Sequence, residues 1–183
     1  MVAAGVPPTA REFITIPTGV AFAMLTELLT AIKTAWDTGL ATPGTPPIPA
    51  PPLWYYEVPQ DAAHDPTTGL AALPPIYAVY FPLPRTPIGK LLLNGARMDD
   101  TIIQFSIFAS QPPDLAKQIS PLAALAFADR VTAVFDNKQL ALTGDSSCIS
   151  MRRTGLWPDA DSDGGYVVHI EYQVGTFSPN PGG

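Results

Sequence analysis

The stretch of the sequence most suggestive of chemistry is acidic. Asp159, Asp161 and Asp163 alternate with small residues and are followed by Gly164. Calcium-binding loops open in this way, because alternate carboxylates converge on one ion and the glycine permits a sharp turn. The twelfth position of such a loop is normally glutamate, but here it is Ile170. We therefore interpret the stretch as a solvated connection between strands and predict no metal site. A weak divalent-ion site is the alternative, and titration calorimetry with calcium would test it.

Other residues that could support catalysis are few. His64 and His169 are the only histidines, and Cys148 is the only cysteine. A two-histidine metal site or a cysteine nucleophile therefore has little to draw on. No G-x-S-x-G, P-loop or G-x-G-x-x-G motif is present. His169 falls within a predicted strand and is interpreted as a sheet-face residue. We predict no catalytic residue, no cofactor and no enzymatic activity.

The tandem pair Arg152-Arg153 lies near the end of another predicted strand. It offers a partner for the acidic 159–163 loop of a neighbouring copy, a pairing that suits a head-to-tail ring. A solvent-exposed pair with no partner is the simpler interpretation of surface arginines. The candidate subunit interface consists of the two arginines and the three loop carboxylates, namely Arg152, Arg153, Asp159, Asp161 and Asp163.

The overall composition favours burial in an assembly. Charged residues make up 14% of the chain, against about 25% in an ordinary soluble domain. A monomer with so few charges would expose contiguous apolar patches, and such patches usually mark protein contacts. A proline-rich and alanine-rich monomer is the alternative.

The net charge and the short apolar runs argue against a nucleic-acid-binding protein and against a membrane-spanning protein. The net charge is −6 with no Lys/Arg run, which argues against specific nucleic-acid binding. An acidic surface is compatible with a channel through which DNA slides without sticking. No apolar stretch reaches the roughly 18 residues of a membrane span, and the N-terminus lacks the pattern of a signal peptide. With one cysteine, no intrachain disulfide forms.

Apolar periodicity and turn residues predict the helices and strands that position these residues. A first helix begins near Thr18 and ends near Gly39, with a face made of Phe22, Leu25, Leu29, Ile32 and Trp36. The proline-rich segment 42–52 is a stiff connector, since proline lacks an amide donor. A second helix opens at Ser120-Pro121 and runs to about Asp136. Strands are expected at 53–58, 76–81, 101–110, 146–154 and 166–177, with a hairpin turn at Asn94-Gly95. In the strand at 101–110, alternation places Ile103, Phe105, Ile107 and Ala109 on one face and the polar Gln104 and Ser106 on the other.

The order of helix, strands, helix and strands predicts an α+β fold. We expect a single domain whose mainly antiparallel sheet carries both helices on one face. The domain should span residues 14–177, between a flexible N-terminal arm at 1–13 and a flexible C-terminal tail at 178–183.

These segments together resemble the tail terminator, or tail completion, proteins of siphophages, particularly those of phages that infect actinobacteria. The resemblance covers most of the chain and is strongest in CISMRRTGLWPDADSDGGYVVHIEYQVGTF, residues 148–177. It extends to GVAFAMLTELLTAIKTAW, LWYYEVPQDAA, YAVYFPLP, MDDTIIQFSIFAS and SPLAALAFADRVTAVFDN. The segments 42–52 and 60–75 are longer than the usual links of the family.

The resemblance implies a structural virion protein without catalysis. Six copies would form a ring that binds the growing tail tube, stops its elongation and joins it to the head-tail connector, with DNA passing through the lumen. The protein would be assembled in the host cytoplasm and reside at the head-proximal end of the tail. A head-completion stopper or another minor tail protein is the nearest alternative. A small hydrolase or calcium-dependent module, built on the acidic loop and His169, is a third.

Overall fold

A computed structural model describes residues 18–59, 74–83, 90–91, 96–109, 121–160 and 166–179. Two helices and six strands follow one another along the chain. They are α1 (Thr18–Gly39), β1 (Leu53–Tyr55), β2 (Ile76–Pro82), β3 (Lys90–Leu91), β4 (Arg97–Ala109), α2 (Pro121–Phe135), β5 (Ser147–Ala160) and β6 (Tyr166–Ser178). The predicted arm at 1–13, residues 60–73 of the segment 60–75, and the Asn94-Gly95 turn lie outside the described residues.

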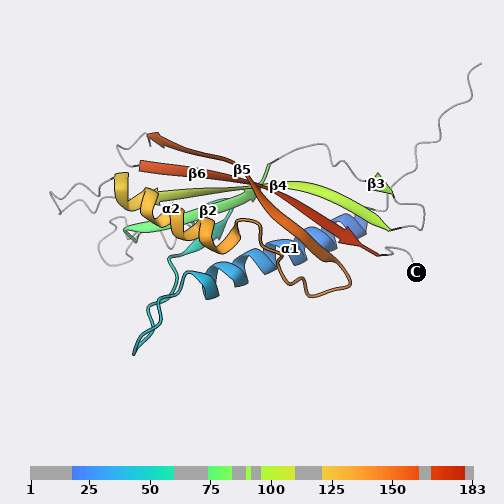
Figure 1. The fold of residues 1–183 in the computed structure, drawn as a ribbon, viewed down its shortest axis with the longest axis horizontal. Coiled ribbons are helices and arrows are strands. Elements are labelled where there is room, and N and C mark those ends of the chain that lie inside the picture. The colour runs from blue at the N-terminus through green and yellow to red at the C-terminus, as the bar shows by residue number, and fades with distance from the viewer. Residues whose placement is uncertain are drawn as a thin grey trace, which may run out of the picture.

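The six strands form one sheet in the order β1-β2-β4-β6-β5, with β3 attached to β4. Only the β1–β2 pair is parallel, and all other pairs are antiparallel. Both helices lie on the same side of this sheet (Figure 1). The predicted α+β fold, with a mainly antiparallel sheet and two helices on one face, is therefore confirmed. Within the described part of the chain, no helix is long and apolar enough to cross a membrane.

The core lies between the helices and the sheet. Alternation along β4 turns Ile103, Phe105, Ile107 and Ala109 towards the helices, as predicted, and all four are buried. Each helix contributes a stripe at steps of three and four residues. The buried residues of the two stripes are Met24, Leu28, Ala31, Ile32 and Trp36 from α1, and Ala124, Phe127, Ala128, Val131 and Phe135 from α2.

The buried face of α1 differs from the predicted one. Ile32 and Trp36 are fully buried as expected, but Leu25 and Leu29 are only half-buried. Leu28, one residue before Leu29, is the side chain that enters the core. Because successive helical residues are separated by about 100°, two overlapping stripes of the same spacing exist here, and contact with the sheet selects the second.

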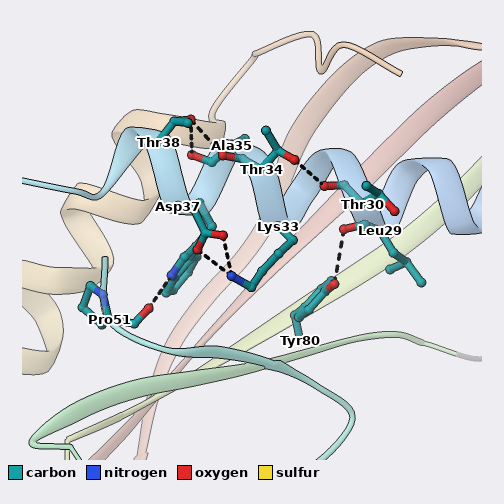
Figure 2. A network of polar contacts seen from close by, with 10 residues as sticks. Leu29, Thr30, Lys33, Thr34, Ala35, Asp37, Thr38, Pro51 and Tyr80 are labelled. Atoms are coloured by element: carbon teal, nitrogen blue, oxygen red, sulfur yellow. Dashed lines mark hydrogen bonds and ion pairs between the residues drawn. The ribbon is translucent and has the colours of Figure 1, made fainter. Parts of the chain in front are cut away.

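Polar contacts hold α1 against β2 and against the segment that follows the helix. The Tyr80 hydroxyl of β2 donates to the Leu29 carbonyl of α1 at 3.2 Å, and the indole of Trp36 donates to the Pro51 carbonyl at 2.7 Å (Figure 2). The Trp36 ring stacks on Phe105, with centroids 5.9 Å apart. Burial raises the pKa of Tyr80 to about 12, with smaller contributions from Tyr55 and Asp37.

Several strand boundaries differ from the sequence prediction. The first strand ends at Tyr55, because Tyr56 adopts a positive φ of 66°, a left-handed conformation that ends an extended strand. The strand predicted at 146–154 continues as β5 to Ala160, so Asp159, predicted to lie in the acidic 159–163 loop, lies in a strand. β6 ends at Ser178, one residue inside the predicted C-terminal tail.

Candidate subunit interface

β5, the strand that carries the two arginines and Asp159, is an edge strand of the sheet. Its first half is covered on the outer side by the chain that follows α2. The Asn137 amide donates to the Met151 carbonyl at 2.8 Å, and the Met151 amide donates to the Lys138 carbonyl at 2.9 Å. Beyond Arg153, no described residue bonds to the outer backbone groups of the strand. Among the described residues, no strand pairs with the outer side of the second half of β5, and this open edge is the kind of surface that pairs with another chain.

The open half of β5 tolerates a proline because of its register. β6 runs without irregularity, so the pairs Met151↔Val174 and Pro158↔Val168 have the same orientation in the ladder. The Met151 amide points away from β6, and the Pro158 nitrogen does the same. Proline costs no ladder hydrogen bond at such a position, which is why it is confined to edges. The sequence around Pro158 predicts a loop, but the strand register at this position permits a proline within a strand.

A β-bulge determines which side chains of β5 share a face. Arg153 pairs with Tyr172 and Gly155 pairs with Glu171, which leaves Thr154 as the extra residue. Before the bulge Arg153 faces the helix side, with Tyr172. After it Trp157, opposite His169, faces the other side of the sheet. The bulge therefore reverses the alternation and turns Trp157 away from the helices.

Arg153 is engaged within its own chain. Its guanidinium lies 3.1 Å from Asp136 at the end of α2, and the Tyr172 hydroxyl donates to the other oxygen of the same carboxylate at 2.7 Å. Tyr172 is fully buried. Burial, and then the hydrogen bond to Asp136, raise the pKa of Tyr172 above its ordinary range. Arg153 thus joins β5 to α2, and sequence analysis did not identify Asp136 as its partner.

Arg152 and Asp159 differ from Arg153 in that both are exposed on the face away from the helices. No described residue forms an ion pair with Arg152. The two lie seven positions apart on one strand, a separation of roughly 20 Å at the usual rise per residue. At this separation they cannot pair with each other within one copy. Asp161 and Asp163, the other predicted members, lie outside the described residues.

Trp157 is an exposed aromatic side chain held in a fixed orientation. Its side of the strand includes Gly155, where an added Cβ would lie only 2.8 Å from the Trp157 ring. The His169 ring lies beside it, with centroids 5.5 Å apart and planes inclined by 33°. The residue nevertheless keeps 37% of its surface exposed. An exposed ring that is already ordered loses little conformational entropy when it binds.

His169 itself is held in the sheet, as the sequence predicts for a sheet-face residue. Its Nδ1 lies 3.0 Å from the Ser106 hydroxyl and 3.0 Å from the Gln104 amide nitrogen. A Ser–His pair can activate a serine nucleophile when a carboxylate orients the imidazole. Here the flanking group is an amide, and Ser106 is buried. The arrangement orients the ring beside Trp157 and lacks the pattern of an activated nucleophile.

No group of three histidine, cysteine or acidic side chains that could hold a metal ion occurs among the described residues. The exposed Trp157 ring was not predicted from the sequence as part of a contact surface. One signal for it exists, the G-x-W spacing of Gly155 and Trp157, which puts both residues on one face of a strand and leaves room for the ring over the glycine.

Comparisons with known proteins find no matching family and only low similarity to solved structures. No protein-family model matches it. No curated protein matches it either. A solved chain from the virion of a native gene transfer agent particle is 12% identical, with a TM-score of 0.47, and the alignment covers 88% of this chain and 100% of that chain. A second solved chain is 13% identical, with a TM-score of 0.41, and 88% and 96% of the chains are covered. Likenesses this low carry no argument about function.

Proposed function

We propose that this chain is a structural virion protein that forms a ring, terminates a phage tail tube and joins it to the head-side connector. The observation that carries the proposal is the inequality of the two sheet edges. β5 is fourteen residues long and has no strand on its outer side among the residues that the structure describes, whereas β1 at the other edge is three residues long. Contact between unlike surfaces of identical subunits is head-to-tail, and head-to-tail contacts produce a ring when the rotation closes.

The exposed surface supports an assembling protein. Several large apolar side chains are solvent-exposed in a chain with only 14% charged residues. They are Ile48, Tyr55, Tyr56, Leu122, Ile149, Leu156, Trp157 and Tyr166. Covering exposed apolar surface of this kind favours association with further subunits and with the tube.

The charged residues of β5 supply an electrostatic component of the contact. Arg152 of one copy would meet Asp159, together with Asp161 and Asp163, of the next copy. Pairs of this kind fix orientation and partner choice more than they add affinity. The net charge of −6 suits a lumen through which DNA passes without specific binding. A ring of six copies is the expected assembly, located in the virion at the head-proximal end of the tail.

Two other functions are compatible with parts of this picture. A head-completion stopper would use similar edges, and labelling one end of purified tails with an antibody distinguishes it from a terminator. A calcium-dependent module or hydrolase would depend on the acidic loop and on His169. Titration calorimetry with calcium tests that function, and an absence of heat would dismiss it.

A charge exchange tests the ring directly. Arg152→Asp should weaken assembly, because Asp159 of the neighbour then faces a like charge, and adding Asp159→Arg to the same chain should restore it. Native mass spectrometry and electron microscopy, with and without tail-tube protein, measure ring formation. A tube-elongation assay measures termination. The proposal is wrong if the wild-type chain stays monomeric with tube ends present and does not limit tube length.

A further inference from the structure

We propose that the segment 42–52, called here the proline arm, docks onto Trp157 of a neighbouring copy. The inference rests on the proposed function, since it names the contact that would join subunits of the ring. The partner of the exposed Trp157 ring would be a second copy of this chain.

The proline arm is an ordered projection. It leaves the body of the domain between α1 and β1 as a narrow loop (Figure 1). Thr42 and Ile48 exchange two backbone hydrogen bonds, of 2.9 and 3.0 Å. At its roots, Arg130 donates to the Leu40 carbonyl at 2.7 Å and Trp36 donates to the Pro51 carbonyl at 2.7 Å. A projection tied at its base and closed midway loses little entropy on binding.

The composition of the arm determines what it can bind. Its eleven residues include six prolines and no charged residue, and residues 42–49 are all exposed. Ile48 has 64% of its surface exposed. Because prolines lack amide donors and the Ile48 amide is already used, the arm cannot add to the open β5 edge as a regular strand. The exposed prolines and Ile48 can instead pack against an aromatic ring, and the proline carbonyls can accept hydrogen bonds from N–H groups.

Trp157 meets these requirements. Its ring is pinned over Gly155 and beside His169, yet it is 37% exposed. Its indole carries an N–H donor that suits a proline carbonyl. The position also favours contact between copies. The arm leads directly into β1 at one edge of the sheet, whereas Trp157 lies on β5 at the opposite edge. A contact between them is therefore heterologous and propagates from copy to copy.

The exposed pair Tyr55 and Tyr56 is the competing aromatic surface. It adjoins the root of the arm on the β1 edge, and its rings pack against each other at 4.5 Å. An arm bound there in a second copy would join two like edges and give a closed dimer. Substitutions of Tyr56 and of Trp157 distinguish the two surfaces.

Two variants, each altering one side of the contact, test the inference. Trp157→Ala removes the ring, and Ile48→Ser with Pro49→Gly alters the arm. Each alone should weaken self-association about tenfold or more, as removal of an aromatic anchor does. A 1:1 mixture should recover heterodimers, because the intact arm of the first variant binds the intact Trp157 of the second. Tyr166→Ala, which removes a similarly exposed aromatic at the same end of the sheet, is the matched control and should weaken assembly far less than Trp157→Ala.

Native mass spectrometry and sedimentation velocity measure these states, and circular dichroism checks that each variant folds. Rings that persist in both variants, or an effect of Tyr56→Ala in place of Trp157→Ala, would overturn the inference and leave the proposed function standing. Loss of self-association in both variants, with recovery of heterodimers, supports the inference even if the wild-type protein fails to cap tubes. A wild-type chain that is monomeric both alone and with tubes overturns both.

Discussion

The junction of Tyr172, Asp136 and Arg153 gives the most quantitative prediction. Tyr172→Phe removes one hydroxyl from a fully buried ring and leaves its packing in place. The lost hydrogen bond is 2.7 Å long and its acceptor is a carboxylate. Hydrogen bonds to charged groups contribute about 1.5–3 kcal/mol. We therefore expect Tyr172→Phe to lower the free energy of unfolding by about 2 kcal/mol.

The other two members of the junction should behave differently. Asp136→Asn keeps an oxygen that accepts from Tyr172 but loses the charge opposite Arg153. That ion pair is 39% and 27% exposed at its two side chains, and solvent-accessible pairs contribute roughly 0.2–1 kcal/mol. Asp136→Ala removes this ion pair and also leaves the buried hydroxyl without its acceptor, so it should cost more than Tyr172→Phe. A double-mutant cycle between Tyr172→Phe and Asp136→Ala should give a coupling of about 1.5 kcal/mol.

Urea unfolding of the monomer, at concentrations too low for assembly, measures these differences through the midpoint at constant m-value. Tyr166→Phe is the matched control, because this tyrosine is 40% exposed and its substitution should change stability by less than about 0.5 kcal/mol. A Tyr172→Phe effect as small as that of the control, or a coupling near zero, would refute the reasoning.

Two further predictions concern α1 and its neighbours. The pKa of Tyr80 is raised from 10.0 to about 12, so between these pH values the folded state keeps a proton that the unfolded state releases. Stability from this group should be complete below pH 10 and decline as the pH rises to 12, and unfolding curves of Tyr80→Phe should lack that component. Gly39→Ala should cost about 1–3 kcal/mol, because its Cβ would lie 2.8 Å from Val134 of α2. Adding Val134→Ala should relieve that specific clash, and thermal unfolding of the single and double variants checks it.

Local signals in the sequence were enough for the helices and the central strand. α1 has the predicted bounds, because its apolar periodicity ends where Gly39 interrupts it. α2 ends at Phe135, next to the predicted end at Asp136. In β4, strict alternation assigned Phe105 to the core side and Gln104 to the opposite side. Each of these features depends on side chains within one element and on one buried face.

The edges of the sheet could not be predicted in the same way. β1 is short because Tyr56 adopts a left-handed conformation, and nothing in LWYYEV indicates it. β5 is long because Pro158 sits where an edge strand needs no donor. Edge position is a property of the assembled sheet. The Asp136 partner of Arg153 depends in turn on how α2 packs on β5, so a residue that looked available from sequence is already bound.

The bulge at Thr154 connects the stability of the domain with its capacity to assemble. On one side of it, Arg153 points to the helices and is held by Asp136. On the other side, Trp157 points away from them, over Gly155 and beside His169. Without the extra residue, alternation would continue unbroken, and the tryptophan would turn towards the helix side and away from His169. One inserted residue thus assigns adjacent parts of a single strand to two roles, the first in holding α2 on the sheet and the second in offering an aromatic surface to a neighbour.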